Sequence, residues 1–339
     1  MRETPAVVKR VEENQMKKLT ALLLAALMVF SLAACGNGGN GGEEASQYNI
    51  GIVQLVQHDA LDAATNGFMD AVKAELGEEN VVFDVQNASG DSANCATIVN
   101  GFVSDNVDLI LANATPALLA AVNGTQTIPV LGTSITDYGD ALKIENFNGT
   151  VGGNISGTSD QAPLDKQADM VLEICPDAKN VGILYCSAEP NSVFQADKVE
   201  GYLTDKGVKV TRYTFTDSND VASVTATACS ECDALYVPTD NTAASCGEAI
   251  HNAASGSGVP IIAGEENACK LFGVATLSVD YYNLGVTTGK MAAKILKGEA
   301  DIAEMAVEFD ENPQLKYNPV ICEELGITPP DGYQAMDMD

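Results

Sequence analysis

The stretch "NIGIVQL" (49–55) decides the fold, because the chain repeats its pattern 131 residues later as "NVGILYC" (180–186). Two further pairs follow in the same order: "DLILANATPA" (108–117) with "DALYVPTDNTA" (233–243), and "IPVLGTS" (128–134) with "VPIIAGE" (259–265). The three offsets are 131, 125 and 131 residues. Echoes in one order at a nearly constant offset indicate two similar lobes in tandem.

Short β-rich runs alternate with helical patterns from residue 49 onward. The first lobe has expected strands at 49–55, 81–85, 107–113 and 128–134, and expected helices at 60–76, 92–104 and 115–122. This order predicts an α/β fold of two similar Rossmann-like lobes, each a parallel sheet with helices on both faces, joined by a hinge. Later segments are expected to cross back to the first lobe (279–297), add a last strand (302–310) and close with a helix and tail (317–330).

The start of the chain is typical of an exported protein. Residues 19–34 are apolar apart from Thr20 and Ser31, and Met16-Lys17-Lys18 precedes them. This pattern predicts a signal peptide, because the run is too short for a spanning helix. We divide the chain into an upstream extension and signal peptide (1–34), Cys35 with a flexible linker (35–47), a first lobe (48–157 plus about 280–300) and a second lobe (158–279 plus about 301–335).

The charge of the chain makes nucleic acid a poor partner, and we expect none. It carries 18 basic and 47 acidic residues, and five basic and three acidic residues precede Cys35, so the remainder holds 13 and 44. Such an acidic surface repels phosphate backbones.

Eight cysteines follow Cys35, and their spacing does not complete a metal site. Cys229 and Cys232 have CxxC spacing without a second pair, and the two histidines, His58 and His251, are far apart in sequence. We expect thiols that pack as small hydrophobic groups, and no metal or cofactor. Whether any of them form a disulfide stays open.

Polar residues follow the expected strands of both lobes. Ligands of open parallel sheets bind beyond the carboxyl ends of the strands, so two facing lobes would form a cleft lined by these residues. The expected ligand-binding residues are Gln54, Gln57, His58, Asn113, Ala114, Thr115, Thr133, Ser134, Asp160, Ser187, Asn191, Ser192, Asp240, Asn241, Glu265 and Asp280. The set fits a small polar ligand, although simple N-capping is the alternative for those at helix starts.

Several stretches carry a family resemblance over about residues 48–330. They are "IGIVQLVQHDALDAATNGF" (50–68), "LILANATPA" (109–117), "NISGTSD" (154–160), "EPNSVFQ" (189–195), "ALYVPTDNT" (234–242), "SVDYYNLGVTTGKMAAKILKG" (278–298) and "LGI" (325–327). Together they resemble the tryptophan/tyrosine-type substrate-binding proteins of ABC transporters. The resemblance implies a periplasmic-binding-protein type I fold, an aromatic amino-acid ligand, and delivery to a membrane permease with a cytosolic ATPase. Gln57 departs from the glutamate expected before the histidine.

The residues Leu32-Ala33-Ala34-Cys35 resemble the lipobox of bacterial lipoproteins. In that family the cysteine thiol takes a diacylglyceryl group. The resemblance therefore implies a protein anchored through Cys35 to the outer face of the bacterial cytoplasmic membrane, because two acyl chains hold stably.

An amino-acid ligand needs a site for an anion and a site for a cation. The helix starts at Thr115, Asn191 and Asn241 could bind a carboxylate through free N–H groups. The candidates for the ammonium are Asp160, Asp240, Glu265 and Asp280. The ligand ring could pack on Leu61, Tyr281 or Tyr282, and the absence of tryptophan argues against a sugar site.

The function expected from the sequence is that of an extracytoplasmic solute-binding lipoprotein that closes about a hinge, as a monomer and without catalysis. Two alternatives stay open. One is a sensor module for another solute, such as a branched amino acid, a sugar or a nucleoside. The other is an exported hydrolase, which the absence of a recognisable nucleophile beside a base disfavours.

Overall fold

The computed structural model describes residues 47–310 and 312–338. The expectations for residues 1–46, including the signal peptide and the lipidation of Cys35, lie outside the described residues. The described chain contains two sheets, of six and seven strands. None of its helices, in the ranges 47–310 and 312–338, has the length and apolar character needed to cross a membrane.

The first sheet has the strand order β11-β5-β4-β3-β1-β2, and all its neighbouring strands are parallel. The strands are β1 (Tyr48–Gln54), β2 (Val81–Asn87), β3 (Leu109–Asn113), β4 (Val130–Ile135), β5 (Ile155–Ser159) and β11 (Glu308–Phe309). The helices of this lobe are α2 (Asp59–Leu76), η1 (Glu78–Asn80), α3 (Ser92–Asp105), α4 (Thr115–Gly124), α5 (Tyr138–Ala141), α12 (Tyr281–Leu296) and η2 (Ile302–Glu304).

The second sheet has the order β13-β12-β10-β9-β8-β6-β7, with β12 antiparallel to β10. The strands are β6 (Asn180–Cys186), β7 (Lys209–Phe215), β8 (Ala234–Val237), β9 (Ile261–Ala263), β10 (Ala275–Ser278), β12 (Gln314–Tyr317) and β13 (Gln334–Ala335). The helices are α6 (Leu164–Ile174), α7 (Pro190–Asp205), α8 (Val221–Glu231), α9 (Asn241–Ser245), α10 (Gly247–Ala254), α11 (Glu266–Phe272) and α13 (Pro319–Leu325).

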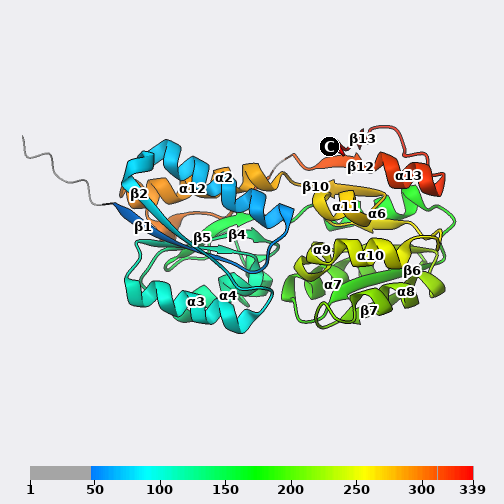
Figure 1. The fold of residues 1–339 in the computed structure, drawn as a ribbon, viewed down its shortest axis with the longest axis horizontal. Coiled ribbons are helices and arrows are strands. Elements are labelled where there is room, and N and C mark those ends of the chain that lie inside the picture. Colours follow the sequence, from blue (N-terminus) through cyan, green and yellow to red (C-terminus); the bar gives the residue numbers. More distant parts are fainter. Residues whose placement is uncertain (1–46, 311, 339) are drawn as a thin grey trace, which may run out of the picture. The chain divides into compact units, whose positions relative to one another are not determined.

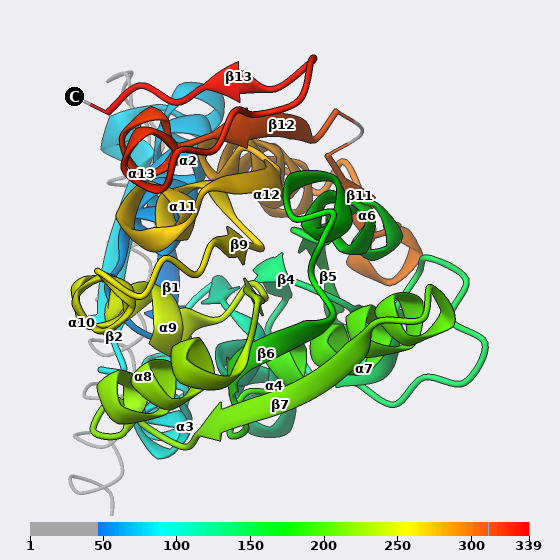
Figure 2. The same cartoon turned by 90° about the vertical axis from the view of Figure 1, so that its right-hand side faces the viewer.

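Both faces of each sheet are covered by helices. On β3, Leu109 and Leu111 join the apolar cluster of α2 and α12, whereas Ile110 and Ala112 join that of α3 and α4. Figure 1 shows these two helix pairs on opposite sides of the first sheet. Figure 2 shows α6 and α7 to the right of β6 and β9, with α8, α10 and α11 to the left. The alternation of side chains along buried strands produces this three-layer arrangement, so the predicted fold class is confirmed.

The repeat seen in the sequence extends to hydrogen bonds. The orders β2-β1-β3-β4-β5 and β7-β6-β8-β9-β10 are the same. In the first lobe, the backbone N–H of Asn49 donates to the Asp108 carboxylate over 2.7 Å. In the second, the N–H of Asn180 donates to the Asp233 carboxylate over 2.9 Å. The echoed Asp residues thus hold the first strand against the third in both lobes.

The late part of the chain differs from the expected boundaries. Residues from about 301 were expected in the second lobe, but Ile302 and Val307 are buried in the two apolar clusters of the first. β11 pairs with β5, so the chain leaves the first lobe after Phe309. The expected strand at 302–310 shrinks to two residues, because residues 302–304 form a 3₁₀ turn. The first sheet also continues to Ser159, two residues beyond the expected boundary.

The cysteines of the described residues are free thiols, and six of the eight are buried. Cys229, Cys232 and Cys269, for example, lie in the apolar cluster between the second sheet and α8 to α11. Burial raises the pKa of the Cys269 thiol well above its usual range. These thiols therefore behave as the small hydrophobic groups that the sequence predicted.

Helices α2 and α12 touch through their backbones, and this contact returns α12 to the first lobe. A Cβ atom added to Gly285 would lie 2.0 Å from the carbonyl oxygen of Ala64, and one added to Gly67 would lie 2.1 Å from that of Tyr282. Neither helix has room for a larger residue at these positions. This close contact, which we call the seam, fixes α12 against α2. The first residues of α12 reach the region between the lobes.

Gly285→Ala is expected to lower the free energy of unfolding by about 1–3 kcal/mol, because the added methyl group overpacks the seam. Urea unfolding of the purified protein measures this change. Gly201→Ala is the matched control. Gly201 is also helical, an added Cβ there meets nothing within 4 Å, and a gain of roughly 0.5–1 kcal/mol is expected. Equal stability of the two variants would contradict the close packing of α2 on α12.

Candidate functional site

A pocket of the described chain takes its walls from both lobes, where the strands end. We call it the inner pocket, and it is lined by His58, Leu61, Ser134, Thr136, Asp160, Asn191, Thr239, Asp240, Asn241, Ala244, Glu265 and Tyr281. Its free volume is about 10 Å³, which is room for about one water molecule. The lobes and side chains are therefore closed tightly over these residues.

The inner pocket brings together seven of the residues expected at a ligand site. They are His58, Ser134, Asp160, Asn191, Asp240, Asn241 and Glu265. Leu61 and Tyr281, two of the three candidates for packing on a ligand ring, also line the pocket. Tyr282 lies elsewhere, because its side chain is largely exposed and its hydroxyl donates to Asp70.

Four other expected residues are buried outside the inner pocket, and three of them brace the first lobe through hydrogen bonds. Gln54 donates to Asp62 over 2.7 Å and accepts from Thr65 over 2.7 Å. Asn113 donates to the carbonyl oxygen of Leu61 over 2.8 Å. The remaining members of this group are Ala114, at the start of α4, and Thr133, whose hydroxyl lies 3.3 Å from that of Thr158. Gln54 and Asn113 thus hold the ends of β1 and β3 against α2, and Thr133 contacts β5.

The other expected residues also lie outside the inner pocket. Thr115 is buried at the start of α4, and Ser192 is fully buried in α7. Gln57, Ser187 and Asp280 are exposed. Ser187 donates to the carbonyl oxygen of Phe215, and Asp280 caps α12 by accepting from the backbone N–H of Asn283 over 2.9 Å. Capping therefore accounts for Asp280.

Thr136 and Gln195 belong to the site region, although the sequence did not single them out. The Gln195 amide lies 3.4 Å from the Thr136 hydroxyl and holds the backbone of Thr239 on both sides, donating to its oxygen and accepting from its N–H. Thr136 was missed because β4 runs to Ile135, one residue beyond its expected end. Gln195 lies four residues after Asn191, so both are on one helix face, and this spacing could have identified it.

Three carboxylates of the inner pocket are buried and differ in their partners. Glu265 accepts from the backbone N–H groups of Asn267 and Ala268 at the start of α11, and burial raises its pKa to about 7. Asp240 accepts from the N–H groups of Cys186 and Ala243; burial and, to a lesser degree, the nearby Glu189 charge raise its pKa. Both oxygens of each of these two groups are engaged.

Asp160 differs because only one of its oxygens has a partner among the residues that the structure describes. Its Oδ2 accepts from the Tyr281 hydroxyl over 2.8 Å, while its Oδ1 is buried without a hydrogen bond. Burial raises its pKa, and the nearby hydroxyl groups of Tyr281 and Thr136 oppose that rise. A cation beside Oδ1 would favour the ionised carboxylate.

Four buried polar atoms that belong to inner-pocket residues have no hydrogen-bond partner among the described residues. They are His58 Nδ1, Ser134 Oγ, Asp160 Oδ1 and Asn191 Oδ1. Unpaired buried polar atoms are rare and costly in native proteins, so their clustering indicates a site that a ligand completes. Ser134 also has a φ of 56°, a strained backbone typical of functional sites.

Glu189 fills the start of α9. Its carboxylate accepts from the backbone N–H groups of Asn241 and Thr242, the Thr242 hydroxyl and the Asn241 amide, over 2.6–3.1 Å. The Asn241 Oδ1 lies 3.2 Å from His58 Nε2 in the other lobe. The start of α9 was one of three candidates for binding a ligand anion, but its N–H groups are already engaged by a carboxylate.

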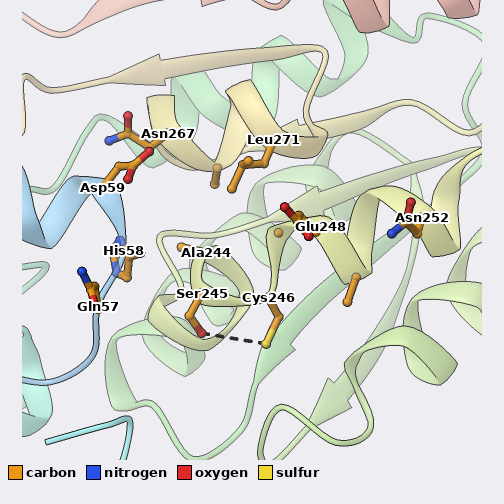
Figure 3. Close-up of a pocket in the computed structure, with 13 residues that line it drawn as sticks. Gln57, His58, Asp59, Ala244, Ser245, Cys246, Glu248, Asn252, Asn267 and Leu271 are labelled. Carbon is orange, nitrogen blue, oxygen red and sulfur yellow. Dashed lines mark hydrogen bonds between the residues drawn. The ribbon is translucent and has the colours of Figure 1, made fainter.

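A second, larger pocket adjoins the first. It has a volume of about 580 Å³, and its walls are Gln57, His58 and Asp59 with residues of α9, α10 and α11. Figure 3 shows His58 and Ala244 on its wall, and both residues also line the inner pocket. We call this the outer pocket; it opens to solvent.

Comparisons with known proteins find relatives over most of the chain. The family described as ABC transporter substrate binding protein matches residues 49–336. A tyrosine-binding protein of Clostridioides difficile is 35% identical over 295 residues, covering 84% of this chain and 85% of that protein.

Two solved structures extend the comparison. An ABC domain in complex with L-Trp from Streptococcus pneumoniae matches with a TM-score of 0.81 at 32% identity, over 86% of this chain and 100% of that one. A ligand-free, open substrate-binding protein with adhesive properties from Clostridium difficile matches with a TM-score of 0.65 at 34% identity, over the same shares.

Glu265→Gln is expected to reduce the pH dependence of stability. The buried carboxyl has a pKa of about 7 against an ordinary 4.5, so the folded chain keeps a proton that the unfolded chain loses between these values. Its contribution, on the order of 1–3 kcal/mol, is complete below the ordinary pKa and is lost as pH rises through about 7. Urea unfolding at about pH 5 and about pH 8 measures the change.

The control for this measurement is Glu248→Gln, which removes an exposed carboxylate of α10. This control is expected to keep the pH dependence of the native protein. An equal pH dependence in Glu265→Gln and the native protein would rule out the raised pKa of Glu265.

Proposed function

This chain belongs to the family of ABC transporter substrate-binding proteins, and from this premise we propose that its inner pocket binds an aromatic amino acid for delivery to a membrane permease. The observation that carries the proposal is the group of four unpartnered, buried polar atoms at the inner pocket. The relatives support it, since one is a tyrosine-binding protein and one is a complex with L-Trp. The family is one of solute binding, and we propose that this chain performs no catalysis.

The ligand ammonium binds at Asp160. Among the carboxylates of the pocket, Glu265 and Asp240 have both oxygens engaged by backbone N–H groups, whereas Asp160 Oδ1 has no partner. An ionised carboxylate in a buried site needs a cation or hydrogen-bond donors to offset its desolvation. An ammonium group supplies both.

The ligand carboxylate lies near the start of α7. Of the three helix starts considered, that of α9 is engaged by Glu189, and the residues at the start of α4 do not line the inner pocket. No side chain caps the first turn of α7, and Asn191 in that turn lines the pocket. Pro190 has no N–H group, and those of Ser192 and Val193 donate to the Glu189 carbonyl oxygen. The attraction for an anion therefore comes from the Asn191 N–H group and the helix dipole.

Binding is coupled to closure of the lobes. His58 meets Asn241 and Thr136 meets Gln195 across the lobes, over 3.2 and 3.4 Å. The inner pocket has about 10 Å³ of free volume, so an amino acid enters only when the lobes are further apart. The better match to the L-Trp complex than to the ligand-free, open protein, at similar identity, supports a closed arrangement here. A ligand that contacts both lobes shifts the equilibrium toward this arrangement.

The protein acts outside the cytoplasm, as its family does. We further propose that it is a monomer anchored through a diacylglyceryl group on Cys35. The lipobox resemblance at Leu32 to Cys35 supports the anchor, and the glycine-rich residues that follow provide a tether to the folded part.

Asp160→Asn is expected to weaken binding of L-tyrosine or L-tryptophan by at least about 30-fold, because the ammonium loses its buried counter-charge. Isothermal titration calorimetry of ligand-stripped protein measures the affinity. The matched control is Asp280→Asn, since Asp280 caps α12 outside the pocket and asparagine caps a helix equally well. An equal affinity in both variants would exclude Asp160 as the ammonium site.

Cys35→Ser is expected to release the protein from the membrane, because serine cannot form the thioether that holds the diacylglyceryl group. Fractionation of expressing cells, followed by immunoblotting of membrane and soluble fractions, measures the change. Cys246→Ser, which alters a thiol in the folded part, is the control and is expected to stay in the membrane fraction. Retention of the Cys35→Ser protein in the membrane would contradict the anchor.

A further inference from the structure

The Glu189 carboxylate fixes the orientation of the Asn241 amide. The backbone N–H groups of Asn241 and Thr242 donate to Glu189 Oε2 and Oε1 over 3.1 and 2.8 Å. The carboxylate is therefore an acceptor on this side. The Asn241 side-chain atom 2.6 Å from Oε2 must be the amide nitrogen. Its oxygen, Oδ1, is consequently the atom that faces His58.

The Asn241 oxygen in turn fixes the proton of His58. A carbonyl oxygen only accepts, so the His58 Nε2 atom at 3.2 Å must carry the hydrogen that it donates. Burial lowers the pKa of His58 and outweighs the opposing charges of Glu189, Asp62 and Asp59. The imidazole is therefore neutral at pH 7, with its single proton on Nε2 and a lone pair on Nδ1.

The burial of His58 Nδ1 favours the inner pocket, rather than the outer one, as the place that its lone pair faces. His58 lies between the two pockets, on the walls of both, as Figure 3 shows for the outer one. The outer pocket opens to solvent, but Nδ1 is buried and has no hydrogen-bond partner among the described residues. The neighbouring walls of the inner pocket include the apolar side chains of Leu61 and Ala244. An aromatic ring with one polar donor fits such surroundings.

The acceptors outnumber the hydrogens of an ammonium group by one. Asp160 Oδ1 and Asn191 Oδ1 are buried acceptors, and the Ser134 hydroxyl can accept as well as donate, so these three atoms can accept from the three N–H groups of an ammonium. His58 Nδ1 remains as the fourth. On the basis of the proposed function, we infer that His58 determines specificity by accepting a hydrogen bond from a donor on the ligand ring, a phenol O–H or an indole N–H, so that phenylalanine is rejected.

The physical basis of this selectivity is the cost of an unpaired buried acceptor. Phenylalanine would leave His58 Nδ1 without a partner in a closed pocket, while tyrosine or tryptophan supplies the missing hydrogen. Sites built to hydrogen-bond a substrate hydroxyl or N–H discriminate strongly against analogues that lack it. We expect a preference of about 10- to 100-fold for the ligand with the ring donor.

The test compares ligands that differ only in the ring donor. L-tyrosine is paired with L-phenylalanine, and L-tryptophan with β-(3-benzothienyl)-L-alanine, in which sulfur replaces the indole N–H. Isothermal titration calorimetry on the ligand-stripped native protein is expected to give the 10- to 100-fold preference in at least one pair.

Two variants of His58 distinguish the roles of its two ring nitrogen atoms. In His58→Gln the amide nitrogen can replace Nε2 and keep the bond to Asn241, but no atom replaces Nδ1, so the preference is expected to fall to within about threefold. In His58→Asn the amide can place an acceptor near Nδ1 and lose the bond to Asn241. This variant is expected to bind all ligands more weakly and to keep the preference.

Equal affinities within both ligand pairs in the native protein, or an unchanged preference in His58→Gln, would overturn the role of His58 and leave the proposed function standing. Binding of none of the four ligands would overturn both.

Discussion

A buried polar atom must find a hydrogen-bond partner, and this constraint organises the region between the lobes. Parallel sheets of one strand order bring their polar strand ends to the same edge. Glu189 and Glu265 are satisfied there by the N–H groups of short helices. Asp160 is satisfied only in part. The difference separates the carboxylates that build the scaffold from the one that can bind a ligand.

The same constraint links binding to closure. In the closed arrangement, four buried atoms lack partners among the described residues, and each costs free energy that solvent would recover if the lobes separated. The interlobe bonds of His58 and Gln195 oppose this cost only in part, because each replaces a hydrogen bond to water. A ligand that supplies the missing donors removes the penalty. Under the proposed function, the position of the lobes therefore depends on whether a ligand is bound.

The fold could be predicted from the sequence because its signals are local and repeated. The echo of 49–55 in 180–186 reflects two lobes whose strand orders and Asn–Asp contacts are the same. The site was predicted less completely, since strand ends supply two kinds of polar side chain. Gln54 and Asn113 turn toward α2 as braces, whereas Ser134 turns into the pocket. A shift of one residue along a strand decides whether its polar side chain braces a helix or lines the pocket. Amino-acid composition does not reveal that shift. The predicted change of lobe near residue 301 was wrong, because the chain stays in the first lobe until β11. Only two residues of β11 pair with β5, so the sequence carries a weak strand signal there.

Glu189 does not line the inner pocket, yet it determines which nitrogen atom of His58 can accept a hydrogen bond there. Its influence on His58 passes through the amide of Asn241, and each step is forced by which atoms can donate. These three residues come from separate parts of the sequence, so no motif could reveal the relationship. The contacts of Glu189 taken alone would not reveal this relationship either, because they resemble those of an ordinary helix cap. A second-layer carboxylate can thus set the hydrogen-bonding character of a pocket by fixing a tautomer two hydrogen bonds away.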